Sequence, residues 1–135
     1  MRLFLIVLCL AGVGVLAYIR LAPGDPERWH VAIDASSDAD FDGGAIRVLG
    51  ASPDDFATAD AALRTLPRTR VLAGSLEDGR ITYVTRSLAF GFPDYTTLQH
   101  SDGTLKAHAR LRFGRSDFGV NRERLEQVLG AVQGR

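Results

Sequence analysis

The chain has 135 residues, 46% of them apolar and 24% charged, which allows one globular domain in addition to a membrane segment. Its formal net charge is zero, so the composition shows no sign of the net basic domain that nucleic-acid binding requires. The single cysteine, Cys9, excludes an intramolecular disulfide and a multi-cysteine zinc site, and no cofactor motif is present.

An uncharged apolar run of seventeen residues, Leu3–Ile19, lies between Arg2 and Arg20. As a helix it would be about 26 Å long, close to the ~30 Å hydrocarbon core of a bilayer. The run predicts that residues 1–21 form a transmembrane anchor, which contacts the membrane through residues 3–19. A cleaved signal peptide is the alternative, because Val15-Leu16-Ala17 is a passable cleavage site.

The flanking charges favour one orientation of this segment. Arg2 and the α-amino group precede it, whereas Asp25 and Glu27 follow it closely. The positive-inside tendency therefore places the N-terminus inside and the C-terminal domain outside. In a bacterium this predicts a single-pass inner-membrane protein with a periplasmic domain.

Residues 22–30 are expected to form a linker to a single domain over residues 31–135, because two prolines and a glycine resist regular structure there. Trp29–Ile33 is expected to be a brief strand or a docking segment for the only tryptophan. The acidic run 34–44 resembles a calcium-binding loop in its Asp spacing. It lacks the required Glu at the twelfth position, so a solvated surface loop is expected.

Charge is distributed unevenly along the domain. Nine acids and two bases give −7 over residues 25–60, and twelve bases and seven acids give +5 over residues 61–135. The two halves are expected to complement each other within one fold.

Turn and helix signals divide the domain into elements. A strand over 45–49 precedes a helix that begins at Ser52-Pro53, with Ser52 as N-cap, and ends before Pro67. Strands separated by turns follow, and then a last helix; these elements are Arg70–Ala73, Arg80–Leu88, Asp94–His100, Thr104–Phe113 and Asn121–Val132. The order predicts an α+β fold: an antiparallel sheet of about four to five strands with two helices packed on one face, preceded by an N-terminal transmembrane helix.

Alternation along the strands predicts a basic outer face on this sheet. In the last strand, apolar residues alternate with polar ones that include Arg110 and Arg112, which therefore point away from the helices. The strand over 80–88 adds Arg86 to the same face, and Asp94 and Tyr95 are expected nearby.

The stretch from Arg110 to Arg124 combines five arginines with two glycines. Arginine forks suit carboxylates and phosphates, and glycines let the backbone approach a ligand. One interpretation is therefore an anion site, in which Arg115, Asp117 and Asn121 join the outer-face residues and the last helix contributes its N-terminal amides. Phe92, Tyr95 and Phe118 would wall an apolar part of this pocket.

The other interpretation of the same residues is structural. Asp94 and Asp117 would be held by Arg86, Arg110, Arg112 or Arg115, and the network would fix the Gly91–Asp94 turn against the final loop. Asp117 could also cap the last helix by accepting backbone hydrogen bonds. The two interpretations can coexist.

Three ordered motifs resemble domain-of-unknown-function family 1499. They are Tyr83-Val84-Thr85-Arg86-Ser87, Gly91-Phe92-Pro93-Asp94-Tyr95 and Arg112-Phe113-Gly114-Arg115-Ser116-Asp117-Phe118-Gly119-Val120-Asn121-Arg122, with Asp25-Pro26-Glu27-Arg28-Trp29-His30 as a similar lead-in. The resemblance implies a bacterial or plastid protein with an N-terminal hydrophobic segment, and it implies no agreed activity. The chain departs from the family at Ala109 and Leu111, where serines are usual, and at Leu88, where a basic residue is common.

Catalysis has little support in the sequence. His30, His100 and His108 stand at unrelated spacings, and no serine lies in a nucleophile elbow. We therefore expect a binding module for an anionic ligand, such as a lipid headgroup, a carboxylate or an acidic partner segment. One alternative is a structural or assembly protein of the cell envelope, whose protein partner the sequence does not identify. The other is a hydrolase-like enzyme with His100 or His108 as base.

Overall fold

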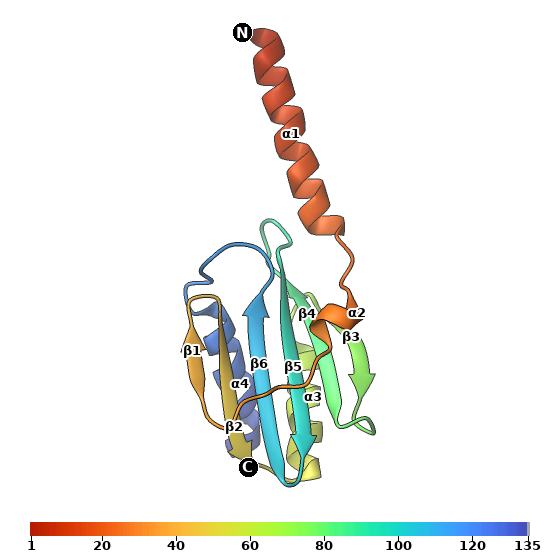
Figure 1. Cartoon of the computed structure of the whole chain (residues 1–135), viewed down its shortest axis with the longest axis vertical. Helices are drawn as coiled ribbons and strands as arrows, with labels where there is room; N and C mark the ends of the chain where they lie inside the picture. Colours follow the sequence, from red (N-terminus) through yellow and green to blue (C-terminus); the bar gives the residue numbers. More distant parts are fainter. Residues whose placement is uncertain (135) are drawn as a thin grey trace.

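The computed structural model describes residues 1–134. Its first element, α1 (Arg2–Leu21), is an apolar helix of 20 residues that projects from the rest of the structure (Figure 1). Within the described residues it is the one helix long and apolar enough to cross a membrane, and a signal sequence would have the same length and composition.

The remaining elements form an α+β domain, as predicted. They are α2 (Pro26–Trp29), β1 (Ala39–Phe41), β2 (Gly44–Gly50), α3 (Pro53–Thr65), β3 (Thr69–Ser75), β4 (Arg80–Arg86), β5 (Pro93–Ser101), β6 (Thr104–Leu111) and α4 (Val120–Gln133). Across residues 1–134 the six strands form one antiparallel sheet in the order β1-β2-β6-β5-β4-β3. Helices α3 and α4 cover one face of it (Figure 1).

The sheet has more strands than the predicted four to five because of β1. Residues 39–41 lie in the acidic run that was expected to be a loop, yet they pair with β2 at the sheet edge. Arg47 of β2 accounts for this pairing: it donates to the Asp40 carboxylate at 2.7 Å and lies 3.9 Å from Asp38. These ion pairs across the edge offset the poor strand propensity of an acidic segment.

Helix α3 begins where the sequence predicts. Ser52 and Asp55 form a reciprocal capping box, and Pro53 occupies the first turn. Phe56 and Leu63 then face the sheet and are at most 3% exposed. Helical spacing therefore places one apolar stripe of α3 in the core.

A hydrogen-bonded polar cluster lies within the apolar core between the helices and the sheet. The Tyr83 hydroxyl of β4 donates to the Asp60 carboxylate of α3 at 2.5 Å, and Arg64 donates to the same oxygen at 2.8 Å. Burial and the neighbouring carboxylate raise the pKa of Tyr83, so the phenol stays protonated and remains a donor.

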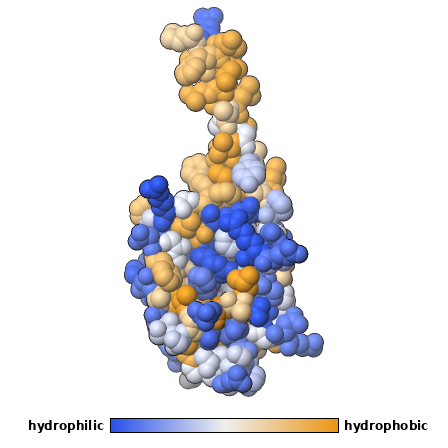
Figure 2. Space-filling view, in the orientation of Figure 1, coloured by the Kyte–Doolittle hydropathy of each residue, from blue (hydrophilic) through white to orange (hydrophobic). Residues whose placement is uncertain are grey.

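The opposite face of the sheet is covered by residues 22–38, which we call the strap. The strap contains α2 and then crosses β4, β5 and β6 as an irregular segment (Figure 1). Trp29 docks on the sheet, as the docking-segment expectation predicts. It is 8% exposed, and its ring stacks on that of Tyr95 with centroids 4.1 Å apart. The strand expected over Trp29–Ile33 does not form. Hydrophilic residues gather on this face below the hydrophobic α1 (Figure 2).

Candidate functional site

Three arginines lie on the outer face of the sheet, as alternation predicts. Tyr95 pairs with Val84 on one side and with Arg110 on the other. Val84 and Tyr95 pack beneath the strap. Arg86 and Arg112 lie two residues further along β4 and just past the end of β6, so their side chains point to the same side.

The side chains of Arg110 and Arg112 are hydrogen-bonded to the strap and do not extend freely into solvent. Arg110 Nη2 donates to the carbonyl of Trp29 at 2.6 Å, and its guanidinium lies 5.4 Å from the centre of the Trp29 ring. Arg112 Nη1 donates to the carbonyl of Pro23 at 2.9 Å and to the Tyr95 hydroxyl at 3.2 Å. Burial lowers the pKa of Arg110 to about 10, which leaves it charged at neutral pH.

Arg86 holds the end of α1 to the β4–β5 loop. Its Nη1 donates to the carbonyl of Gly91 at 2.9 Å and to that of Ile19 at 3.3 Å, and its Nη2 donates to that of Ala22 at 3.4 Å. These bonds give Arg86 a structural role at the junction of α1 and the sheet.

Asp94 does not lie on the outer face with Tyr95, contrary to the expectation. Adjacent strand residues point to opposite faces, and Asp94 faces α4, where Arg124 Nη2 lies 3.4 Å from its carboxylate. Burial raises the pKa of Asp94, although the charge of Arg124 opposes this shift. Arg124 also donates to the Asn121 side-chain oxygen. Asp94, Arg124 and Asn121 therefore connect α4 to β5. The arginine that holds Asp94 comes from the last helix and is none of the four that the structural interpretation named.

Asp117 caps α4, which is the structural alternative considered for it. Its carboxylate accepts from the backbone N–H of Gly119 at 2.9 Å and from that of Asn121 at 3.1 Å. The protein's own carboxylate thus occupies amides that an anionic ligand would need. Arg115 is exposed on the same loop, and its side chain makes no hydrogen bond or ion pair within residues 1–134.

An apolar hollow of about 450 Å³ lies beside this loop. Phe92 and Phe118 line it, as do Asp94 and Asp117. The expectation that Tyr95 shares this wall is wrong, because Tyr95 lies under the strap on the other face of the sheet. The aromatic wall and the outer-face arginines are therefore separate places.

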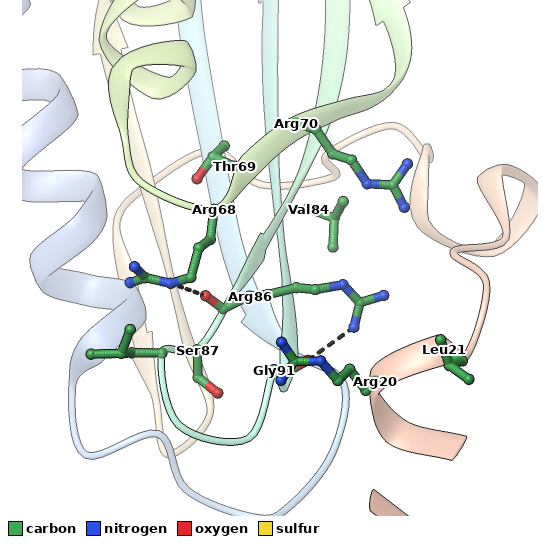
Figure 3. A pocket seen from close by; sticks show the side chains of 10 residues that line it. Arg20, Leu21, Arg68, Thr69, Arg70, Val84, Arg86, Ser87 and Gly91 are labelled. Atoms are coloured by element: carbon green, nitrogen blue, oxygen red, sulfur yellow. Dashed lines mark hydrogen bonds between the residues drawn. The ribbon is translucent and has the colours of Figure 1, made fainter. Parts of the chain in front are cut away.

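A different group of arginines meets where α1 joins the sheet. Arg20 of α1, Arg70 of β3 and Arg86 of β4 line one space of about 450 Å³. The guanidinium group of Arg86 lies between those of Arg20 and Arg70 (Figure 3). We call this space the arginine pocket. Arg68 lies at its rim, with its Nε donating to the Arg86 carbonyl at 2.9 Å. Among the described lining residues there is no Asp or Glu.

The arginine pocket concentrates positive charge. Arg20 and Arg70 make no side-chain hydrogen bond or ion pair anywhere in the described chain. Burial lowers the pKa of Arg86, and the charge of Arg70 lowers it further. Two unbound forks beside a third cation can stabilise a phosphate or carboxylate by paired hydrogen bonds.

Sequence reasoning missed Arg20, Arg68 and Arg70. The hairpin between β3 and β4 places Arg70 opposite Val84, so applying alternation to this hairpin would have added Arg70 to the outer face. In the sequence, Arg20 only marks the end of the apolar run, and nothing there indicates that it lies beside two strands. Arg68 has a left-handed φ of 55° in the turn after α3, and no sequence pattern indicates that.

Two of the three histidines have local partners for their rings, and only one of these two, His100, was a candidate base. His30 Nδ1 lies 2.9 Å from the Thr82 hydroxyl, and His100 Nε2 lies 2.8 Å from the Ala51 carbonyl. Burial lowers the pKa of His108 to about 4, so this ring is neutral near pH 7.

The structure defines a class of protein: an antiparallel α+β domain, closed on one face by its own strap, that carries an apolar N-terminal helix. The model of the family described as "Protein of unknown function (DUF1499)" matches residues 19–132, and the chain belongs to this family. The resemblance seen in the motifs is thereby confirmed.

No curated protein matches the chain. Among solved structures, a DUF4468 family protein from Bacteroides ovatus is similar at 14% identity, over 83% of this chain and 91% of that one, with a TM-score of 0.32. Similarity at this level carries no argument about function.

Proposed function

We propose that the protein is a binding module for an anionic ligand, anchored by α1 in the inner membrane with its domain in the periplasm. The observation that carries the binding role is the arginine pocket. Arg20, Arg70 and Arg86 line one space, and no carboxylate is among the described residues that line it. The charge order around α1 supports the anchoring and the orientation.

The ligand chemistry follows from the donors that are available. Arg20 and Arg70 each present a planar fork that matches two oxygens of a phosphate or carboxylate. A hollow of about 450 Å³ has the size of a small-molecule site. Because Arg20 ends the apolar run, the pocket lies at the level where a bilayer presents its headgroups. A lipid phosphate and a soluble anion share this chemistry.

The outer-face arginines favour a second role, that of a structural protein. Arg110 and Arg112 bind the strap, so their replacement tests the fold before it tests a ligand. Arg70 is the better probe of binding, because within residues 1–134 its side chain holds nothing in place.

Native mass spectrometry of full-length protein, extracted from its membrane in mild detergent, tests the proposal. Wild type and the control Arg115→Ala, an exposed arginine outside the pocket, should carry a stoichiometric anionic mass. Arg70→Ala should lose that mass at an unchanged melting temperature. A lipid-sized adduct and a small adduct would distinguish the two sources of the anion. A bare wild-type mass, even after addition of phosphatidylglycerol or inorganic phosphate, would remove the binding role and leave the structural one.

A further inference from the structure

Two loops at one end of the domain expose large apolar side chains. The β4–β5 loop, residues 87–92, carries Leu88 and Phe90, which are 79% and 54% exposed. The β6–α4 loop, residues 112–119, carries Phe118, which is 93% exposed. Both loops lie at the end of the sheet from which α1 emerges (Figure 1).

The opposite end of the sheet has a different character. Its β3–β4 and β5–β6 turns contain Glu77-Asp78-Gly79 and Ser101-Asp102-Gly103. Leu76, in the first of these turns, is 43% exposed and lies next to these acidic residues. Apolar side chains gathered at one end of a domain indicate a contact surface rather than scattered exposure.

Both loops adjoin the apolar part of α1. Phe90 lines a hollow of about 260 Å³ together with Val13, Leu16 and Ala17 of the helix. In the second loop, Phe113 lies edge-on to Tyr18, with ring centroids 6.2 Å apart. Side chains of both loops therefore lie next to the C-terminal turns of α1.

The rise of α1 gives the depth of this contact. The apolar run ends at Ile19, and Ala17 and Val13 precede that residue by two and six positions. At ~1.5 Å per residue these positions lie about 3 Å and 9 Å beyond the end of the run. Apolar faces of interfacial segments penetrate about 5–10 Å into the headgroup–acyl boundary. A bilayer that surrounds α1 up to Ile19 therefore surrounds Phe90 as well.

The charges next to the loops fit the same partner. Residues 87–92 carry no charge, whereas Arg20 and Arg70 lie in the pocket beneath this loop. The other loop carries Arg112 and Arg115 together with Asp117, which leaves it with one net positive charge. Apolar tips above a cationic base are typical of surfaces that enter a membrane with anionic lipids.

We propose that Leu88, Phe90 and Phe118 insert into the bilayer leaflet next to α1, so that the domain is seated on the membrane and not merely tethered to it. This inference rests on the proposed anchoring by α1, and it does not depend on whether the arginine pocket binds an anion. Seating holds the mouth of that pocket against the headgroup layer.

Depth-resolved fluorescence quenching on full-length protein in phosphatidylethanolamine–phosphatidylglycerol vesicles tests the inference. Native Cys9, which is exposed on α1, carries an environment-sensitive label as the reference for anchoring. In a Cys9→Ala background, Leu88→Cys and Phe118→Cys carry the label on the loops. Glu77→Cys, at the far end of the sheet, is the matched control.

The loop labels should shift to the blue and lose emission to nitroxides attached to the lipid chains, as the Cys9 label does. The Glu77 label should lose emission only to aqueous iodide. Loop labels that behave like the Glu77 label, while Cys9 is quenched from the lipid, would overturn the insertion and leave the anchoring intact. A Cys9 label that iodide reaches would overturn the anchoring, and the insertion with it. Near-UV circular dichroism checks that each variant retains the wild-type fold.

Discussion

Removal of the Arg110 side chain is expected to destabilise the domain by about 3 kcal/mol. Arg110→Ala deletes donors to the carbonyls of Trp29 and His108 and to the Thr97 hydroxyl, at 2.6, 3.2 and 3.2 Å. Charged donors contribute roughly 1.5–3 kcal/mol per bond, and a buried carbonyl left unpaired costs about 1–3 kcal/mol. The loss of a cation over the Trp29 ring adds about 0.5–1 kcal/mol. Against this, burial lowers the pKa of Arg110 to about 10, so deleting the charge returns about 3 kcal/mol of desolvation. The low ends of the three contributions, about 6 kcal/mol together, then leave a net loss of about 3 kcal/mol, which is the smallest effect expected.

Thermal unfolding of full-length protein in mild detergent, followed by Trp29 fluorescence, measures the effect. A loss of about 3 kcal/mol lowers the melting temperature of a domain of this size by about 12 °C. Arg70→Ala is the control, because its side chain holds nothing in the described chain, and its melting temperature should stay within about 2 °C of wild type. If Arg110→Ala also melts within that range, with wild-type Trp29 emission, the strap is not held by this arginine.

Three further predictions concern a histidine, a tyrosine and a pair of glycines. The folded pKa of His108, about 4, is below the unfolded 6.5, so stability is full above pH 6.5 and falls as the pH drops toward 4. The shift corresponds to about 3 kcal/mol, which solvent screening of the partly exposed ring reduces to about 2 kcal/mol. His108→Gln should flatten this slope in urea titrations across that range, and an unchanged slope would contradict the assignment. Tyr83→Phe should cost about 1–2 kcal/mol, because the Asp60 carboxylate loses a hydroxyl donor at 2.5 Å; an unmoved denaturation midpoint would argue against this. Gly130→Ala should stabilise α4 by about 0.5–1 kcal/mol, because alanine favours the helix more than glycine does and the added Cβ would have no atom within 4 Å. Gly74→Ala should lower the melting temperature. Gly74 has a φ of +86°, and the Cβ that alanine adds would lie 2.1 Å from the Arg80 backbone carbonyl oxygen of the paired strand. Shifts of the same sign for the two glycine variants would refute this reasoning.

Most of the sheet could be predicted because its signals are local. The turns at Glu77-Asp78-Gly79 and Ser101-Asp102-Gly103 mark hairpins, and alternation along β6 identifies the face that carries Arg110. The position of Asp94 was predicted wrongly although the same rule covers it, since neighbours in a strand cannot share a face. Strand β1 was missed because its pairing depends on Arg47, a residue of another strand.

The strap and the arginine pocket could not be predicted in this way. Trp29 marks a docking segment, but its partner Arg110 is 81 positions away, and no local pattern encodes such a contact. The arginine pocket joins Arg20, Arg70 and Arg86 from three elements, and it requires the order of strands and the exit of α1 to be known first. Local chemistry identified side chains suited to anions, and the tertiary structure decided which of them are unbound.

The distance in sequence between the strap and its arginines also sets an order of events during synthesis. Trp29 is bonded to a residue made 81 positions later, and at ~5–20 residues per second roughly 4–16 s separate the two. During that interval α2 and its tryptophan do not have the complete surface on which they dock, because β5 and β6 are the last two strands to be synthesised. The nascent strap is therefore the segment most open to proteases and chaperones. A truncation before β6 would therefore affect the opposite end of the chain, because the strap would lack Arg110 and would not dock on the sheet.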